Sequence, residues 1–449
     1  MGVIHYLNDK LVNLVANLGT ARDKSSANQF GHVFITDEEL VAAYRGSWMA
    51  RKIVDIPAFD CTRKWRGWQA SKDQIQAIEA EEKRLNVKAK VKDAMRKGRL
   101  FGGAAIFIGT GDRDLRLPLD PARIAKGGVK YLNVMRRRQL TVKEIETDPQ
   151  SPLFDKPKAY LLADTNVEVH PSRLVIFLGA ESADDELGLV ANEKGWSDSV
   201  LLACKEAIFQ AESVNANVAS LVFEAKVDVL GIPDFAENME NGGAAYEKAV
   251  LSRLNLAAMG KGINGMIVRD ANETYEQKTA SFGTLPDLMD RYDQKVCGSA
   301  DIPATRFMSQ SPAGMSATGE SDTRNYYDRI QSMQELELSP AIAILDECII
   351  RSALGSRPAE IYYEWRPLWQ PTATEKATIG KTVADTISVL SSSGLFNADA
   401  LSKAATTTLV EGNVLPGLEA AIEEFGTEID PEEPDTTPDM GDPEDNTNA

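Results

Sequence analysis

The spacing of apolar residues predicts a chain rich in long helices. Where apolar positions recur every three or four residues, one face of a helix can pack against a core. Thr36-Asp37-Glu38-Glu39 has the form of a capping box before such a face, and a second helical stretch, 47–56, is expected to end at Pro57. The other predicted helices cover residues 1–19, 73–100, 198–221, 234–259, 285–300, 322–354, 374–391 and 398–406.

Short apolar or alternating runs predict strands between these helices. One run, 223–229, alternates apolar with charged residues and is typical of a half-exposed strand. The other predicted strands cover residues 104–108, 131–134, 159–163, 167–169, 174–178 and 361–365. Together these elements predict a mixed α+β body over residues 36–230.

Residues 234–300 predict two helices joined by a small β tip. Gly260, Gly262 and Gly265 end the first helix, and two short strands, 266–269 and 274–279, are expected to form the tip before the second helix. A pair of helices with so small a tip cannot bury its own apolar rows. The pattern therefore predicts association between copies of the chain.

A long polar loop follows this region. Residues 302–323 are small, polar and rich in Gly and Pro, which excludes regular structure. A loop of this length inside a compact chain is uncommon unless it has a function. The long helix predicted after it, 322–354, contains Pro340, which is expected to kink it.

The charge of the chain is concentrated at one end. The formal net charge is −18, but Glu423 to Ala449 contain eleven Asp and Glu and no Lys or Arg, so the rest carries only −7. This tail is expected to be mobile and solvated, either as a solubilising end or as an acidic interaction arm. An acidic protein is a poor candidate for tight, non-specific DNA binding, although DNA can still pass by it.

Cysteine usage and hydropathy limit the remaining classes. The four cysteines, Cys61, Cys204, Cys297 and Cys348, form no CxxC pair, so we expect small core residues in a reducing compartment and neither a zinc site nor a disulfide framework. No apolar run approaches the length of a membrane span. The N-terminal stretch 1–19 is amphipathic, unlike a signal peptide.

Catalytic motifs are weak in this sequence. Gly380-Lys381-Thr382 lacks the first glycine of a phosphate-binding loop, and 260–265 has GxGxxG spacing but follows a helix. His170-Pro171-Ser172 resembles one half of the paired motifs of two-histidine phosphodiesterases, and no second copy exists among the three histidines. We therefore predict that the chain is not an enzyme and needs no cofactor or metal, with His170 in a structural role.

Two tryptophans lie in a basic cluster. Trp65 and Trp68 flank Arg66 and follow Arg63 and Lys64. Stacking on nucleic acid is one reading of this pattern. The more common arrangement has the rings packed in the protein and the charges in water, and that is our expectation here.

Several segments resemble the portal proteins of tailed bacteriophages, in the branch that carries the anti-CBASS-like or portal label. The most specific is Asp301-Ile302-Pro303-Ala304-Thr305-Arg306-Phe307, continued by Ser311-Pro312-Ala313-Gly314-Met315-Ser316-Ala317-Thr318-Gly319-Glu320-Ser321-Asp322 and by Asn325-Tyr326-Tyr327. Supporting matches are Ile53-Val54-Asp55-Ile56-Pro57-Ala58, Thr62-Arg63, Trp68 and His170-Pro171-Ser172-Arg173-Leu174.

The resemblance implies a portal-type α+β fold built into a dodecameric ring. It implies a wing over residues 30–233 with 355–371, stem helices at 234–260 and 284–302, and a clip at 261–283. The tunnel loop would be 303–321, the long kinked helix 322–354 and the crown 372–425. The N-terminal helix with its linker, 1–29, and the acidic tail, 426–449, would lie outside these parts.

The same resemblance implies partners and sites. The ring would sit at one capsid vertex of the virion after assembly in the host cytoplasm, without a membrane, and would contact double-stranded DNA, the terminase large subunit, the head–tail adaptor and the major capsid protein. The expected tunnel-loop residues are Arg306, Ser309, Gln310, Ser311, Ser316 and Thr318, with Asp301 or Glu320 as other partners for Arg306. The expected clip residues are Arg269, Asp270, Asn272, Glu273 and Lys278.

Two other functions remain as alternatives to a portal. One is a different structural ring of the phage, such as a connector or a baseplate component. The other is a cyclic-nucleotide phosphodiesterase related to anti-CBASS enzymes, which would require paired histidine motifs.

Overall fold

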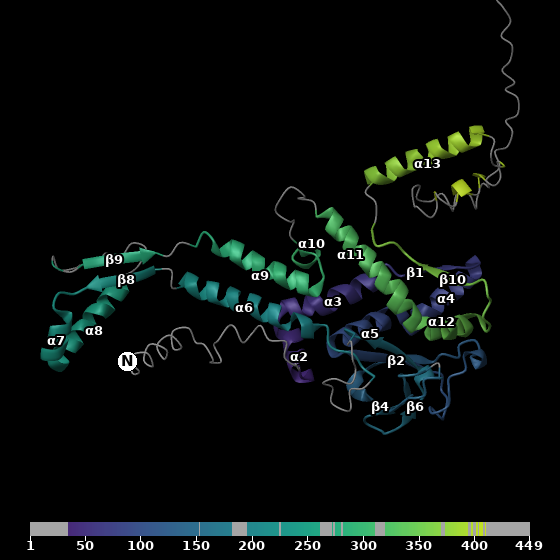
Figure 1. Cartoon of the computed structure of the whole chain (residues 1–449), viewed down its shortest axis with the longest axis horizontal. Coiled ribbons are helices and arrows are strands. Elements are labelled where there is room, and N and C mark those ends of the chain that lie inside the picture. The colour runs from purple at the N-terminus through teal and green to yellow at the C-terminus, as the bar shows by residue number, and fades with distance from the viewer. Residues whose placement is uncertain are drawn as a thin grey trace, which may run out of the picture. The chain divides into compact units, whose positions relative to one another are not determined.

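The computed structural model describes residues 35–151, 153–181, 195–223, 226–260, 272, 274–279, 282–309, 319–369, 373–393, 397, 401–402, 404–406 and 409. The chain divides into two units, Met1–Leu368 and Trp369–Ala449. The second unit contains the helix α13 (Ala373–Ser393), close to its predicted range. All the other labelled elements of Figure 1 belong to the first unit.

The first four helices that the structure describes are α2 (Asp37–Gly46), α3 (Trp48–Arg63), α4 (Lys72–Leu85) and α5 (Val87–Phe101). The predicted capping box is present, since the Glu39 amide donates to Thr36 Oγ1 at 3.2 Å and the Thr36 amide donates to Glu39 Oε2 at 2.9 Å. The single helix expected over 73–100 is divided at Asn86, which has a φ of 55°. A left-handed residue of this kind ends a helix.

The predicted helix stop at Pro57 is wrong, because α3 continues to Arg63 with Pro57 inside it. Proline removes the amide that would bond the carbonyl four residues earlier, which is that of Ile53. In this fold Arg99 of α5 donates from Nη2 to the Ile53 carbonyl at 2.9 Å and from Nε to the Val54 carbonyl at 3.3 Å. A side chain from another helix therefore replaces the missing bond.

The sheets are small and antiparallel. The buried strand β2 (Gly103–Gly109) pairs with β3 (Tyr131–Arg136) on one side and β7 (Leu174–Leu178) on the other. A second sheet contains β4 (Leu140–Ile145), β5 (Pro157–Leu162) and β6 (Glu168–Val169), and a third pairs β1 (Arg66–Gln69) with β10 (Tyr362–Trp365). Short 3-10 turns lie at η2 (Pro121–Arg123), η3 (Arg137–Gln139) and η4 (Pro171–Arg173).

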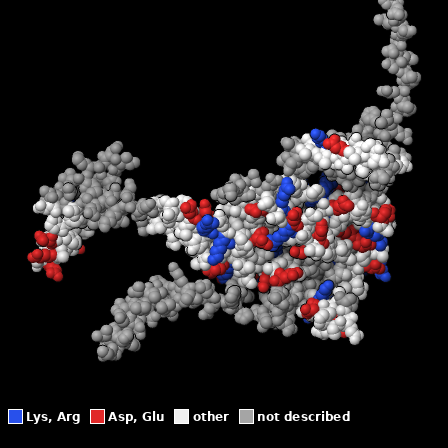
Figure 2. Space-filling view, turned by 45° about the horizontal axis from the view of Figure 1, so that its top comes forward, with Lys and Arg blue, Asp and Glu red and all other residues white. Residues whose placement is uncertain are grey.

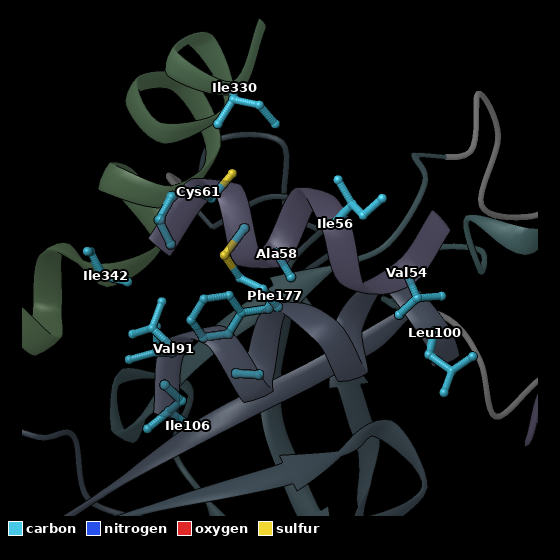
Figure 3. Close-up of a cluster of buried hydrophobic side chains, with 14 of the residues drawn as sticks. Val54, Ile56, Ala58, Cys61, Val91, Leu100, Ile106, Phe177, Ile330 and Ile342 are labelled. Carbon is cyan, nitrogen blue, oxygen red and sulfur yellow. The ribbon is translucent and has the colours of Figure 1, made fainter. Parts of the chain in front are cut away.

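The main core lies where α3, α5, the β2 sheet and the long helix after the loop meet. Figure 3 shows Ala58 and Cys61 of α3 facing Phe177 of β7, with Ile330 and Ile342 approaching from the long helix. All four cysteines are buried and unpaired, as expected for small core residues. Among the described residues, no helix is both long and apolar enough to cross a membrane.

The stem and tip differ from the predicted arrangement. The helix that lies beside α9 (Leu285–Ala300) is α6 (Leu201–Phe223), as Figure 1 shows. Two bonds join this pair: Lys295 Nζ donates to Gln210 Oε1 at 2.7 Å, and Cys204 Sγ donates to the Ser299 carbonyl at 3.3 Å. The predicted pairing of 234–260 with 284–302 is therefore corrected.

The paired strands of the tip enclose a longer segment of the chain than predicted. Strand β9 (Thr274–Thr279) pairs with β8 (Lys226–Gly231), which had been predicted as part of the body. The expected partner strand, 266–269, lies outside the described residues. Between β8 and β9 the predicted single helix is divided into α7 (Phe235–Asn241) and α8 (Gly243–Gly260), with Gly243 at a φ of 58°.

The long helix after the loop contains a change of helical pitch. It consists of α11 (Glu320–Met333), a π-helical segment η5 (Gln334–Leu338) and α12 (Ser339–Leu354). Pro340 lies in the first turn of α12 and removes the amide that would bond the carbonyl of Leu336. Within the segment the Ser339 amide donates to the Gln334 carbonyl, the spacing of a π turn.

The expectation that the charges beside Trp65 and Trp68 stay in water is wrong for Arg66. Its guanidinium is buried, 4.6 Å from the Trp68 ring and 4.5 Å from the Tyr363 ring. It forms ion pairs with Glu82 at 2.8 Å and Asp346 at 2.5 Å. The two carboxylates raise the pKa of Arg66 against the lowering effect of burial. This cluster joins β1, β10, α4 and α12.

We predict that Arg66→Met lowers the free energy of unfolding by about 3–5 kcal/mol, because it leaves the carboxylates of Glu82 and Asp346 buried without a counter-charge. Urea denaturation at fixed protein concentration measures this. The matched control is Arg116→Met, whose pair with Asp114 is exposed to water and is expected to leave the free energy of unfolding nearly unchanged. Equal effects of the two substitutions would contradict the prediction.

Candidate functional site

The two ends of the long polar loop lie close together. The loop begins after the short helix α10 (Ala304–Phe307) and ends at Gly319, which has a φ of 57° and precedes α11. Thr305 Oγ1 and Thr323 Oγ1, one from each end, are 3.4 Å apart. The two described ends of the loop are therefore joined by a direct side-chain contact.

A buried carboxylate on α3 holds both ends of the loop. Asp60 is fully buried and accepts two hydrogen bonds from Arg306, each of 3.0 Å, and one from the Tyr326 hydroxyl at 3.1 Å. Arg63 approaches the same carboxylate at 3.2 Å. A bidentate guanidinium–carboxylate pair of this kind is strong and directional. We call Asp60, Arg306 and Tyr326 the loop clamp.

Electrostatics agree with this geometry. The hydrogen bond to Asp60 raises the pKa of Arg306 above its usual value. Burial, together with the neighbouring Asp60 carboxylate, raises the pKa of Tyr326 far above its usual value, so its hydroxyl stays a donor. A buried carboxylate without such donors would be costly, which is why α3 can carry Asp60 only when the loop ends are docked.

A lysine makes a second tie to the loop. Lys52 Nζ donates to the carbonyl of Phe307 and lies 5.0 Å from the centre of the Trp48 ring and 5.6 Å from that of Phe307. Phe307 is itself fully buried. Phe307 is thus fixed through its backbone and its ring by Lys52, which lies about two helical turns before Asp60 on α3.

The structure changes the interpretation of Arg306. It had been placed among the tunnel-loop residues, with Asp301 or Glu320 as other partners. Its partner is Asp60, while Asp301 pairs with Arg329. Ser309 is exposed at a φ of 58°, and Gln310, Ser311, Ser316 and Thr318 lie outside the described residues.

The clip residues are placed only in part. Lys278 lies in β9 opposite Val227 of β8, and Asn272 lies in the turn before β9. Arg269, Asp270 and Glu273 lie outside the described residues. Lys278 therefore lies in a two-stranded pair, and a common site for all five predicted residues stays a prediction.

Sequence reasoning missed Asp60, Lys52 and Tyr326 as residues of the site. A signal for Asp60 existed, because it is an acidic residue on the face of α3 that also carries Ile53 and Cys61. A charge on an apolar helical face requires a partner. The pattern could not name Arg306 as that partner, since 246 positions separate the two residues.

His170 has a structural position. Its Nδ1 accepts from the Ser172 amide at 3.2 Å and caps the 3-10 turn η4. The Ser172 hydroxyl in turn accepts from the Leu119 amide at 2.8 Å. Burial and the neighbouring Arg173 lower the pKa of His170. Within the part of the chain that the structure describes, no cluster of three or more His, Cys, Asp and Glu side chains could hold a metal ion.

Comparison with known proteins gives two kinds of relative. Two proteins named "Anti-CBASS protein Acb1" align with nearly the whole chain. The protein from Caulobacter sp. (strain RHG1) is 44% identical over 94% of this chain and 69% of its own length. The protein from Sphingomonas paeninsulae is 36% identical over 99% of this chain and 72% of its own length.

These relatives correct one expectation. The prediction that the chain is not an enzyme is contradicted, because both relatives carry the anti-CBASS name. The sequence argument against an anti-CBASS-type phosphodiesterase was that His170-Pro171-Ser172 has no second copy. Histidine spacing alone was therefore an insufficient basis for excluding catalysis.

The fold and the family agree with each other. A chain from the neck of an empty gene transfer agent (GTA) particle, computed with C6 symmetry, has a TM-score of 0.51 at 12% identity, over 84% of this chain and 94% of that chain. This likeness confirms the predicted α+β, portal-type fold. The family model described as phage portal protein matches residues 38–389. The chain therefore belongs to the phage portal protein family.

Proposed function

We propose that this chain is the portal subunit of a tailed phage or a related particle. Copies would associate side by side as a dodecameric ring at one capsid vertex, and DNA would enter and leave through the centre. The observation that carries the proposal is the family match over residues 38–389 together with the portal-type fold. A head-to-tail ring requires an interface that closes on itself.

The long polar loop is the proposed tunnel loop, and its composition suits a sliding duplex. Residues 309–318 contain no charged side chain, and the clamp engages Arg306 with Asp60 at the base. The hydroxyls and amides of Ser309, Gln310, Ser311, Ser316 and Thr318 would offer only weak contacts to phosphates. Strong Lys or Arg contacts would instead hold the DNA in place.

Surface charge supports the same idea. On the face shown in Figure 2, Asp and Glu are interspersed with Lys and Arg, so this face presents mixed charge. The chain as a whole is acidic, with a net charge of −18. Such a protein would not retain DNA by non-specific attraction.

The β8–β9 pair and its connections are the proposed clip. Arg269, Asp270, Asn272, Glu273 and Lys278 would contact the terminase large subunit during packaging and the head–tail adaptor afterwards. The wing would contact the major capsid protein. Support for this assignment comes from the chain order, in which the β8–β9 segment lies between the two adjacent helices α6 and α9.

Imaging of the purified chain tests the proposed ring. Negative-stain electron microscopy is expected to show a twelve-fold ring with a central hole. A particle of another symmetry would favour a connector or baseplate component instead. A folded protein that remains a monomer at every concentration would contradict the proposal.

Deletion of residues 309–318 tests the loop. Because the ends of the loop are tied to Asp60 and to one another, the variant is expected to assemble normally while DNA filling or retention falls about tenfold or more. Filled and empty particles can be counted after gradient sedimentation. Normal filling in the deletion variant would refute the loop's role.

A milder variant, Asp60→Asn, weakens the bonds that hold the two ends of the loop. It is expected to be cut faster by a protease in the loop, and Asp114→Asn is the control because Asp114 is exposed.

The names of the relatives bring a second candidate, hydrolysis of a cyclic nucleotide. The observation in its favour is the 44% identity to a protein named anti-CBASS over 94% of this chain. Among the histidines, only His170 belongs to an HxS motif.

A hydrolysis assay on the purified full chain tests this candidate directly. If it is correct, cyclic oligonucleotides are consumed, and His170→Ala abolishes turnover without loss of the folded state. Ser172→Ala is expected to lower turnover as well, because this serine belongs to the same motif and its hydroxyl contacts the His170 ring. Turnover that survives His170→Ala would exclude this histidine as the catalytic group.

A further inference from the structure

A cleft of about 770 Å³ opens between the end of β7, the stem helices and the π-helical segment. Its lining includes Ile176 and Leu178 of β7, Ala203 of α6, Met333 of α11 and Leu336 of η5. Helix α6 begins at this cleft and α9 ends at it, so the cleft lies at the junction of the proposed stem and wing in the first unit.

The rim of the cleft exposes apolar side chains. Leu336 is 76% exposed and Leu178 is 49% exposed. The π-helical segment presents Leu336, since Pro340 frees the Leu336 carbonyl and the Ser339 amide bonds to Gln334 instead. Segments of this kind are rare and often lie at functional sites. Single exposed leucines are common on protein surfaces, but apolar side chains gathered at the rim of one cleft are typical of an interaction site.

Charged side chains also line the cleft. Arg329 is paired with Asp301. Arg99 bonds the backbone carbonyls of Ile53 and Val54 but, among the described residues, has no carboxylate within ion-pair distance. Glu337 and Glu181 also line the cleft, and burial raises the pKa of Glu337.

We infer that this cleft receives a segment of a second copy of the chain, and that Leu336 is the central apolar contact. The inference rests on the proposed function, because it names the partner that completes the ring at the stem–wing junction. A small ligand inside the cleft would leave Leu336 and Leu178 at the rim in water, whereas a neighbouring polypeptide would cover both. A head-to-tail ring also needs a concave surface that differs from the surface inserted into it.

Substitution at the rim tests the inference without disturbing the fold. Leu336→Glu is expected to raise the concentration needed for ring assembly about tenfold, as loss of one buried leucine contact implies. Its melting temperature as a single chain is expected to stay unchanged because the side chain is 76% exposed. The control is Leu117→Glu, a leucine that is 60% exposed away from the cleft. Mass photometry over a concentration series measures both variants.

Photo-crosslinking identifies the occupant. With p-benzoylphenylalanine at position 336, irradiation of the assembled protein is expected to give covalent dimers, and peptide mapping locates the inserted segment. Rings that form normally in Leu336→Glu, or adducts confined to one chain, would overturn this inference and leave the proposed function standing. Absence of any oligomer of the unaltered chain would overturn both.

Discussion

The buried carboxylate of Asp60 is the interaction on which the candidate site depends. A charge with no exposure to water is stable only if donors surround it, and three of these donors come from Arg306 and Tyr326. These two residues stand on opposite sides of the long polar loop. Because the Asp60 carboxylate on α3 is buried, it needs these donors, and meeting that need brings the two ends of the loop together.

Two prolines near the site, Pro57 and Pro340, interrupt the backbone hydrogen bonding of their helices. At Pro57 the orphaned carbonyl is bonded by Arg99, and α3 continues past the proline to Arg63, so that Asp60 lies within the helix. At Pro340 the chain responds differently, with a π-helical segment that turns Leu336 outward. The difference lies in the neighbours: α5 packs against α3 and supplies a guanidinium, whereas Leu336 lies at the rim of an open cleft.

Membership of the portal family and the names of the relatives point to two kinds of activity. The family match and the fold support a structural ring, and the anti-CBASS name attached to proteins 44% and 36% identical supports an enzymatic role. The described geometry speaks most directly to the first. Asp60 bonds residues on both sides of the long loop, α6 packs beside α9, and His170 serves as the cap of a 3-10 turn.

The sequence by itself determined the local elements and the family resemblance. Helical and strand periodicities located α9, α13, β2 and β7 closely, because each is set by its own alternation of apolar and polar residues. Only the tertiary structure decided that α6 is the helix beside α9, that β8 pairs with β9, and that Arg306 serves Asp60. Those choices join positions up to 246 residues apart, and local periodicity carries no information about which distant surface satisfies a buried charge or a strand edge.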